Sequence, residues 1–156
     1  MIGIRMFKDA KLKGYTLIEG FPGAGLVGPM ANSYMIEKLG MDYIGYIESD
    51  AFPPIAAVHG GVAMFPVRIY KEDRYKLVVI MSEFTIPVET IRELTDELIN
   101  FVRKQEISRI ISIGGMPTQK PTDVVYGIAT TTELTQKFKS AKISTINEGV
   151  VAGGEI

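Results

Sequence analysis

The chain has 156 residues, 46% of them hydrophobic and 22% charged, which predicts a single globular domain over residues 1–156. Its formal net charge of −1 argues against a nucleic-acid partner, and the absence of cysteine, with one histidine present, leaves no disulfide, thiolate chemistry or metal site to predict. No apolar run is long enough to cross a bilayer and residues 1–10 lack a signal-peptide core, so we expect a cytoplasmic protein without a membrane partner.

Strand-like runs alternate with helix-like segments along the chain. The strand-like runs cover residues 16–19, 43–48, 61–70, 75–82, 107–113, 124–130 and 142–147. The run at 75–82 is almost continuously apolar, as expected of a strand that is covered on both faces. Polar residues at 71–74 separate it from the preceding run and predict a hairpin turn.

Three helices are predicted, over residues 24–39, 88–105 and 131–139. The second has an apolar stripe at three- and four-residue spacing, begins after Pro87 and carries acidic residues early and basic residues late. The first ends at Gly40, a residue that commonly stops helices. Strands alternating with helices predict an α/β fold: a layered, mostly parallel sheet with helices on both faces and an antiparallel hairpin at 61–82.

A glycine-rich loop follows the first strand. Gly23, Gly25 and Gly28 spell GxGxxG, and Glu48 follows about 20 residues later, as in a dinucleotide-binding fingerprint. Two features argue against that interpretation: Pro22 removes an amide donor from the turn, and the chain has too few strand–helix units for two mononucleotide-binding halves. The three glycines either bind an anion or other small ligand at the start of the helix, or allow a tight, closely packed turn.

A second motif, residues 48–54, follows the strand at 43–48. Glu48 and Asp50 share one face of an extended chain and are candidates for acid–base chemistry, although such pairs are more often solvated. Phe52 precedes Pro53 and Pro54, which hold the backbone extended. An aromatic side chain on a stiff loop loses little entropy on binding, so we favour a docking surface here and predict no catalytic residue.

Two further glycine pairs mark turns. Gly114 and Gly115 follow the strand at 107–113, at the strand end where ligands commonly bind in open α/β sheets, so a ligand site and a subunit contact are both open. Gly60 and Gly61 follow His59, which we interpret as a polar turn residue because no nucleophile motif accompanies it.

Three segments in this order resemble the proteasome assembly chaperone 2 family, in particular its archaeal members. They are residues 19–28 (EGFPGAGLVG), residues 49–54 (SDAFPP) and the strand that ends in residues 113–115 (IGG). The resemblance covers roughly residues 12–150. The Phe-Pro pair inside the glycine loop separates it from a dinucleotide fingerprint.

The resemblance implies a fold similar to nucleoside phosphorylases and related hydrolases. It also implies a homo-oligomer that binds proteasome α-subunits or other assembly factors, with no catalysis and no cofactor. Phe21, Phe52, Pro53 and Pro54 are the partner contacts predicted on this basis. The alternative is a small-molecule or nucleotide-binding phosphorylase- or hydrolase-like enzyme in which Gly23, Gly25, Gly28, Gly114 and Gly115 hold the ligand.

The C-terminal end departs from the family pattern. The family usually continues through a glycine-rich strand and more helices, so we expect either a missing C-terminal portion or a short member. Some relatives dock through a terminal hydrophobic–tyrosine–any motif, whereas this chain ends in residues 151–156 (VAGGEI) without a tyrosine.

Overall fold

The computed structural model describes residues 1–120 and 122–149. Residues 1–116 form one compact unit, residues 117–149 belong to a second, and each is considered by itself. Within the described ranges, no helix is both long enough and apolar enough to cross a membrane.

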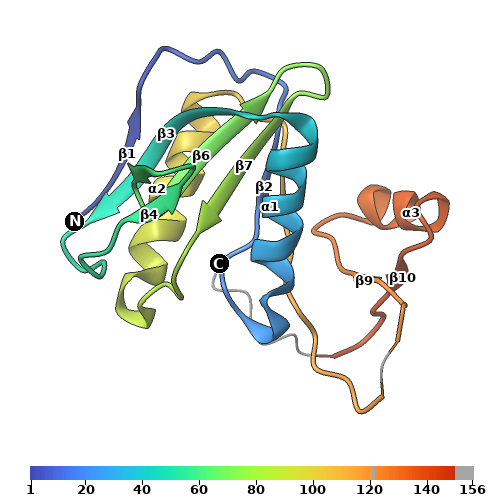
Figure 1. The fold of residues 1–156 in the computed structure, drawn as a ribbon. Helices are drawn as coiled ribbons and strands as arrows, with labels where there is room; N and C mark the ends of the chain where they lie inside the picture. Colours follow the sequence, from blue (N-terminus) through green and yellow to red (C-terminus); the bar gives the residue numbers. More distant parts are fainter. Residues whose placement is uncertain (121, 150–156) are drawn as a thin grey trace. The chain divides into compact units, whose positions relative to one another are not determined.

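The first unit is built on a six-stranded mixed sheet (Figure 1). Its strands, in spatial order, are β1 (Ile2–Met6), β3 (Asp42–Ser49), β6 (Val67–Glu72), β7 (Leu77–Ser82), β2 (Thr16–Glu19) and β8 (Arg109–Ser112). The pairs β1–β3, β3–β6 and β6–β7 are antiparallel, whereas β7–β2 and β2–β8 are parallel. Strands β3, β7, β2 and β8 therefore run in one direction, and their carboxyl ends meet at one edge.

Two helices cover opposite faces of this sheet (Figure 1). Helix α2 (Ile91–Lys104), entered through the short helix η2 (Val88–Thr90), packs Leu94 and Leu98 with Leu17 of β2 in one core cluster. Helix α1 (Val27–Leu39), entered through η1 (Ala24–Leu26), packs Met35 against a second cluster that contains Ile18. Consecutive β2 residues thus face different helices because strand side chains alternate between the two faces.

The predicted α/β class, the helices on both faces and the hairpin at β6–β7 are confirmed, and the sheet is mixed: β3, β7, β2 and β8 run in one direction, and β1 and β6 run against them. Strand β1 was not predicted, and it adds an antiparallel edge beside β3. The run at 61–70 is interrupted at Pro66, which has no amide to donate to a strand ladder. It forms β5 (Val62–Met64) and β6, and β5 pairs with a further strand, β4 (Ala57–His59), in a separate hairpin.

The second unit is a small β–α–β arrangement. Strands β9 (Tyr126–Gly127) and β10 (Ser144–Thr145) pair in parallel, with α3 (Thr132–Ser140) between them in sequence. The Thr131 side chain accepts a hydrogen bond from the Leu134 amide and so caps the helix. The strands predicted at 124–130 and 142–147 are therefore present, but only two residues of each form the ladder.

Candidate functional site

The carboxyl edge of the sheet brings together the motifs that the sequence singled out (Figure 1). The glycine loop (residues 20–26) leaves β2 there, and the Gly114–Gly115 pair follows β8. The insert, defined as residues 50–66, joins β3 to β6, and the loop at 83–87 follows β7. This edge is therefore the candidate site, although the four segments differ in what they leave accessible.

The glycine loop is closed by its own backbone. A Cβ atom at Gly28 would lie 2.7 Å from the Ile113 carbonyl oxygen and 2.8 Å from backbone atoms of Gly20. A Cβ atom at Gly115 would overlap the Ala24 carbonyl oxygen. Gly20, Gly28 and Gly115 thus let α1 approach the ends of β2 and β8 without side chains between them, which supports the close-packing interpretation at these positions.

Other glycines of these loops have different roles. Gly25 has a φ of +67°, a left-handed conformation that favours glycine, and it makes the turn into α1. A Cβ atom at Gly23 would meet its nearest neighbour at 3.9 Å, and one at Gly114 would meet nothing within 4 Å. Both of these glycines are exposed. Ligand binding at the five glycines named from the sequence stays a prediction.

The carboxylates proposed for acid–base chemistry lie apart from the glycine loop. Strands β6 and β7 separate β3 from β2, which at about 4.8 Å per strand places Glu48 roughly 14 Å away. Glu48 accepts a hydrogen bond from Arg5 at 2.7 Å, and this bond raises the pKa of the Arg5 guanidinium. Asp50 is almost fully exposed, 3.8 Å from the N-terminal amine. Both carboxylates line a shallow hollow of about 320 Å³ beside β1, and the structure does not bring them to the glycines.

The predicted contact residues divide between core and surface. Phe21 is buried in the core cluster under α2, where a partner cannot reach it in this structure. Phe52 is half-buried against the same cluster and meets Phe84 edge-on, with ring centroids 5.1 Å apart. Pro53 is half-buried and Pro54 is exposed. Accessible surface in this motif thus begins at the two prolines, and Phe52 anchors the loop.

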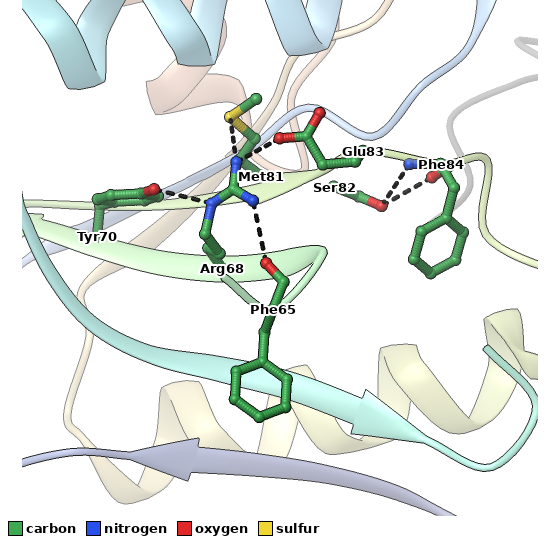
Figure 2. A network of polar contacts seen from close by, with 7 residues as sticks. All are labelled: Phe65, Arg68, Tyr70, Met81, Ser82, Glu83 and Phe84. Carbon is green, nitrogen blue, oxygen red and sulfur yellow. Dashed lines mark hydrogen bonds and ion pairs between the residues drawn. The ribbon is translucent and has the colours of Figure 1, made fainter. Parts of the chain in front are cut away.

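A polar network fixes the far end of the insert (Figure 2). Arg68 of β6 is only 4% exposed, and it donates to the Tyr70 hydroxyl at 2.8 Å, the Phe65 carbonyl at 3.0 Å and the Glu83 carboxylate. The Glu83 amide donates to the Pro66 carbonyl at 3.0 Å. We call these contacts the Arg68 clamp. They hold the end of the insert against the loop that follows β7.

Aromatic stacking supports the clamp. The Phe65 ring lies parallel to Tyr46 of β3, with centroids 3.5 Å apart. In the loop after β7, the Ser82 hydroxyl donates to the Phe84 carbonyl at 2.7 Å, which shapes the turn that carries Phe84 (Figure 2). The insert is therefore anchored at both ends, through Phe52 at its start and Phe65 at its end. Sequence reasoning missed Arg68, and its position as the single charged residue of the run at 61–70 was the available signal.

Helix α1 presents apolar side chains outward as well as inward. Leu26, the last residue of η1, and Met30 and Tyr34 of α1 recur at four-residue spacing and are each more than half exposed, and Val27 is exposed beside Leu26. We call these four residues the α1 surface. The Lys38 ammonium lies 5.8 Å from the centroid of the Tyr34 ring. This surface was not predicted. The sequence held a signal for it, namely that residues 20–36 contain no Asp, Glu, Lys or Arg.

Metal ligands do not gather at this edge. Across residues 1–120 and 122–149 there is no group of three or more His, Cys, Asp or Glu side chains placed to hold a metal ion. His59 is exposed and is the last residue of β4, so it lies in a strand beside the Gly60–Gly61 turn and not in the turn itself as predicted.

Comparison with known proteins identifies relatives of this arrangement. The profile of the PAC2 family matches residues 17–154. The uncharacterized protein MJ0106 of Methanocaldococcus jannaschii is 31% identical over 137 residues, which are 88% of this chain and 56% of that protein.

Two solved structures from Pyrococcus furiosus share the fold. PbaA, described as an archaeal homolog of proteasome-assembly chaperone, superposes with a TM-score of 0.86 at 26% identity, over 96% of this chain and 63% of its own. PbaB, described as an archaeal proteasome activator, superposes with a TM-score of 0.81 at 20% identity, over 99% of this chain and 71% of its own. The chain thus spans 56% and 63% of the lengths of MJ0106 and PbaA.

Proposed function

Because this chain belongs to the PAC2 family, we propose that it is a non-catalytic assembly chaperone that binds proteasome α-subunits or related assembly factors as a homo-oligomer. The family and the resemblance to PbaA support a chaperone-like role. Beyond the chaperone-like role, we propose that the chain binds α-subunits, forms a homo-oligomer and lies in the cytoplasm.

The proposal is carried by one observation: at the carboxyl edge of the sheet, the space beside two glycines is filled, whereas the insert is exposed. Backbone atoms fill the space beside Gly28 and Gly115, where a dinucleotide or similar ligand would be expected. The insert instead presents Pro54 and Ile55 to solvent on a segment anchored at both ends. A stiff apolar segment suits protein recognition because little conformational entropy is lost when it binds.

The alternative, a small-molecule enzyme of the phosphorylase or hydrolase kind, would need the exposed glycines to hold an anion and a nearby carboxylate to act as base. The Arg5–Glu48 pair and the distance between β3 and β2 do not favour it. The likeness of the fold to nucleoside phosphorylases and hydrolases, which the family resemblance implies, stays a proposal under either function.

The test is direct binding of purified proteasome α-subunits from the same organism to the purified chain, measured by biolayer interferometry. We expect saturable binding that is absent with an unrelated protein of similar charge. A thermal-shift screen of phosphate, nucleotides and nicotinamide cofactors runs in parallel, since a ligand at 100 times its Kd stabilises by about 2.7 kcal/mol. No α-subunit binding together with a clear shift from one of these ligands would favour the enzyme.

A further inference from the structure

Three segments meet at the edge of the sheet opposite to the candidate site (Figure 1). They are residues 7–14, which follow β1, residues 71–76, which include the turn between β6 and β7, and residues 103–109, which join α2 to β8. The Gly14 amide donates to the Glu106 carbonyl at 2.9 Å, and the Tyr15 hydroxyl donates to Asp73 at 2.6 Å. The three segments are therefore bonded to one another, and we call the surface that they form the amino edge.

Basic residues are concentrated at the amino edge. The whole chain has 17 Lys or Arg residues and 18 Asp or Glu residues, whereas these three segments hold nine Lys or Arg and four Asp or Glu. A net charge of −1 for the chain thus hides a positive region at one end of the sheet.

Most carboxylates of the amino edge already have partners. Glu72 accepts hydrogen bonds from two backbone amides of its own turn. Asp73 pairs with Lys71 at 2.9 Å. Glu106 pairs with Lys13. These contacts engage three of the four acidic side chains and only two of the nine basic ones.

The other seven basic side chains have no carboxylate partner. Across residues 1–120 and 122–149 they form no ion pair, and all of them are exposed: Lys8, Lys11, Arg74, Lys76, Arg103, Lys104 and Arg109. Arg103 and Lys104 also suit the negative end of the α2 dipole. Cations that the fold leaves unpaired create a positive potential, which attracts an anionic partner.

Lys76 occupies a backbone conformation that glycine adopts more readily. Its φ is +54°, in the left-handed region that is unfavourable for residues with a Cβ atom. The geometry of the turn therefore does not account for a lysine at this position.

The pattern of charge favours the carboxylates of a protein over the phosphates of a nucleic acid. Glu72 and Asp73 stand between Lys71 and Arg74 in the sequence. A nucleic-acid strand has a phosphate at every nucleotide and would meet these carboxylates, whereas a protein segment can place Asp and Glu opposite the cations alone. The Arg74 guanidinium also lies 5.1 Å from the centroid of the Tyr75 ring, so it occupies a ring face on which a base would stack.

We propose that the amino edge is a second docking surface, which binds an acidic segment of a partner protein. This surface and the insert lie at opposite ends of the same sheet. The inference therefore goes beyond the proposed binding of α-subunits by the insert and does not depend on it. A chain with docking surfaces at both ends of one sheet can hold two protein partners at once.

Fluorescence anisotropy of the whole chain with a labelled deca-glutamate peptide tests the proposal. We expect saturable binding that weakens at least tenfold when the NaCl concentration rises from about 50 to about 200 mM, because salt screens exposed charges. A deca-serine peptide should not bind. No binding of deca-glutamate at the lower salt concentration would overturn the proposal. A decauridylate RNA that binds more tightly than deca-glutamate would overturn it in favour of a nucleic-acid partner.

Two variants test whether the peptide binds at the amino edge. Lys11→Glu combined with Arg109→Glu reverses two unpaired charges and should weaken binding at least tenfold. Lys76→Gly removes one charge and relaxes the left-handed backbone, so it should keep its fold and weaken binding about threefold.

Arg92→Glu is the matched control for the charge reversals. Arg92 is exposed in the first turn of α2, at the other end of this helix from the amino edge, and a glutamate there suits the helix dipole. This variant should bind deca-glutamate like the wild type. Unchanged binding by the double variant, or an equal loss in Arg92→Glu, would overturn the proposal.

Discussion

The glycine loop and the insert leave the same edge of one sheet, but Gly20 and Gly28 are buried by close backbone packing, whereas the hairpin at 57–64 within the insert is largely exposed. The glycine loop carries the pattern most typical of a ligand site, but Gly20 and Gly28 face each other so closely that no side chain fits between them. The insert carries no ligand motif and presents an exposed apolar tip. The comparison teaches that glycine spacing can report backbone packing, whereas a long stretch without charge in a charged chain reports a surface.

The largest expected effect comes from removing the Arg68 clamp. Arg68→Met leaves the Tyr70 hydroxyl and the Phe65 carbonyl without their donor and Glu83 without its ion pair, so we expect about 3 kcal/mol of lost stability. Chemical denaturation measures it, and limited proteolysis should show faster cleavage within residues 50–66.

Arg5→Met is the control for Arg68→Met, because the Arg5–Glu48 pair is exposed and exposed pairs contribute little. Its unfolding curve should overlay that of the wild type. Equal stability of the two variants would show that the insert does not depend on the clamp.

Gly28→Ala tests the close backbone packing of the glycine loop. The added methyl group meets the Ile113 carbonyl and the Gly20 backbone, neither of which can move cheaply, so we expect a loss of about 2 kcal/mol. Thermal unfolding measures it. Gly23→Ala is the matched control, because its Cβ would lie 3.9 Å from the nearest atom in an extended backbone. A Gly28→Ala variant as stable as Gly23→Ala would contradict the packing role.

The smallest expected effect lies at the opposite edge of the sheet, where Tyr15 donates to Asp73 at 2.6 Å. This bond, with burial and the nearby carboxylate charge, raises the pKa of Tyr15 to about 12, and the same bond, together with that from Lys71, lowers the pKa of Asp73. Tyr15→Phe should lower the melting midpoint by about 2–4 °C at neutral pH, the scale of one hydrogen bond in a chain of this size.

The pH dependence of stability follows from the directions of the two pKa shifts, upward for Tyr15 and downward for Asp73. The Asp73 contribution is present above its ordinary pKa of 3.8 and is lost as the pH falls below it. The Tyr15 contribution is present below its ordinary pKa of 10 and is lost as the pH rises through about 12. The difference between wild type and Tyr15→Phe should therefore persist from pH 5 to pH 9 and shrink in acid. A difference that stays constant down to pH 2 would mean that the lost contact is not this hydrogen bond.

The sequence predicted the elements whose periodicity is strong. Helix α2 has its apolar stripe and β2 its apolar run, and both lie where expected. Strand β1 was missed although Ile2, Ile4 and Met6 alternate, because a pattern of three residues at a chain end is short. The antiparallel pairing of β3 with β1 and with β6 could not be predicted, because it depends on which strands become neighbours.

At the candidate site, the local sequence pattern predicted which segments are loops, but not how deeply their side chains are buried. Phe21 and Phe52 were both expected to contact a partner, yet Phe21 is buried and Phe52 anchors its loop on Phe84. Burial of an aromatic residue depends on which distant segments pack against it, and a local motif does not specify those segments. The Arg68 clamp joins residues from β6 and the loop after β7, so its partners are known only when the strands pair.

The most direct test places the same charge in the insert and in the glycine pair that follows β8, and measures the Kd for purified α-subunits. Pro54→Glu changes the exposed part of the insert, and Gly114→Glu changes an exposed glycine whose Cβ would have open space. We expect Pro54→Glu to weaken α-subunit binding at least tenfold, because a buried unpaired charge is costly, and Gly114→Glu to bind like the wild type. Weak binding by Gly114→Glu alongside unchanged binding by Pro54→Glu would contradict the assignment of function to the insert.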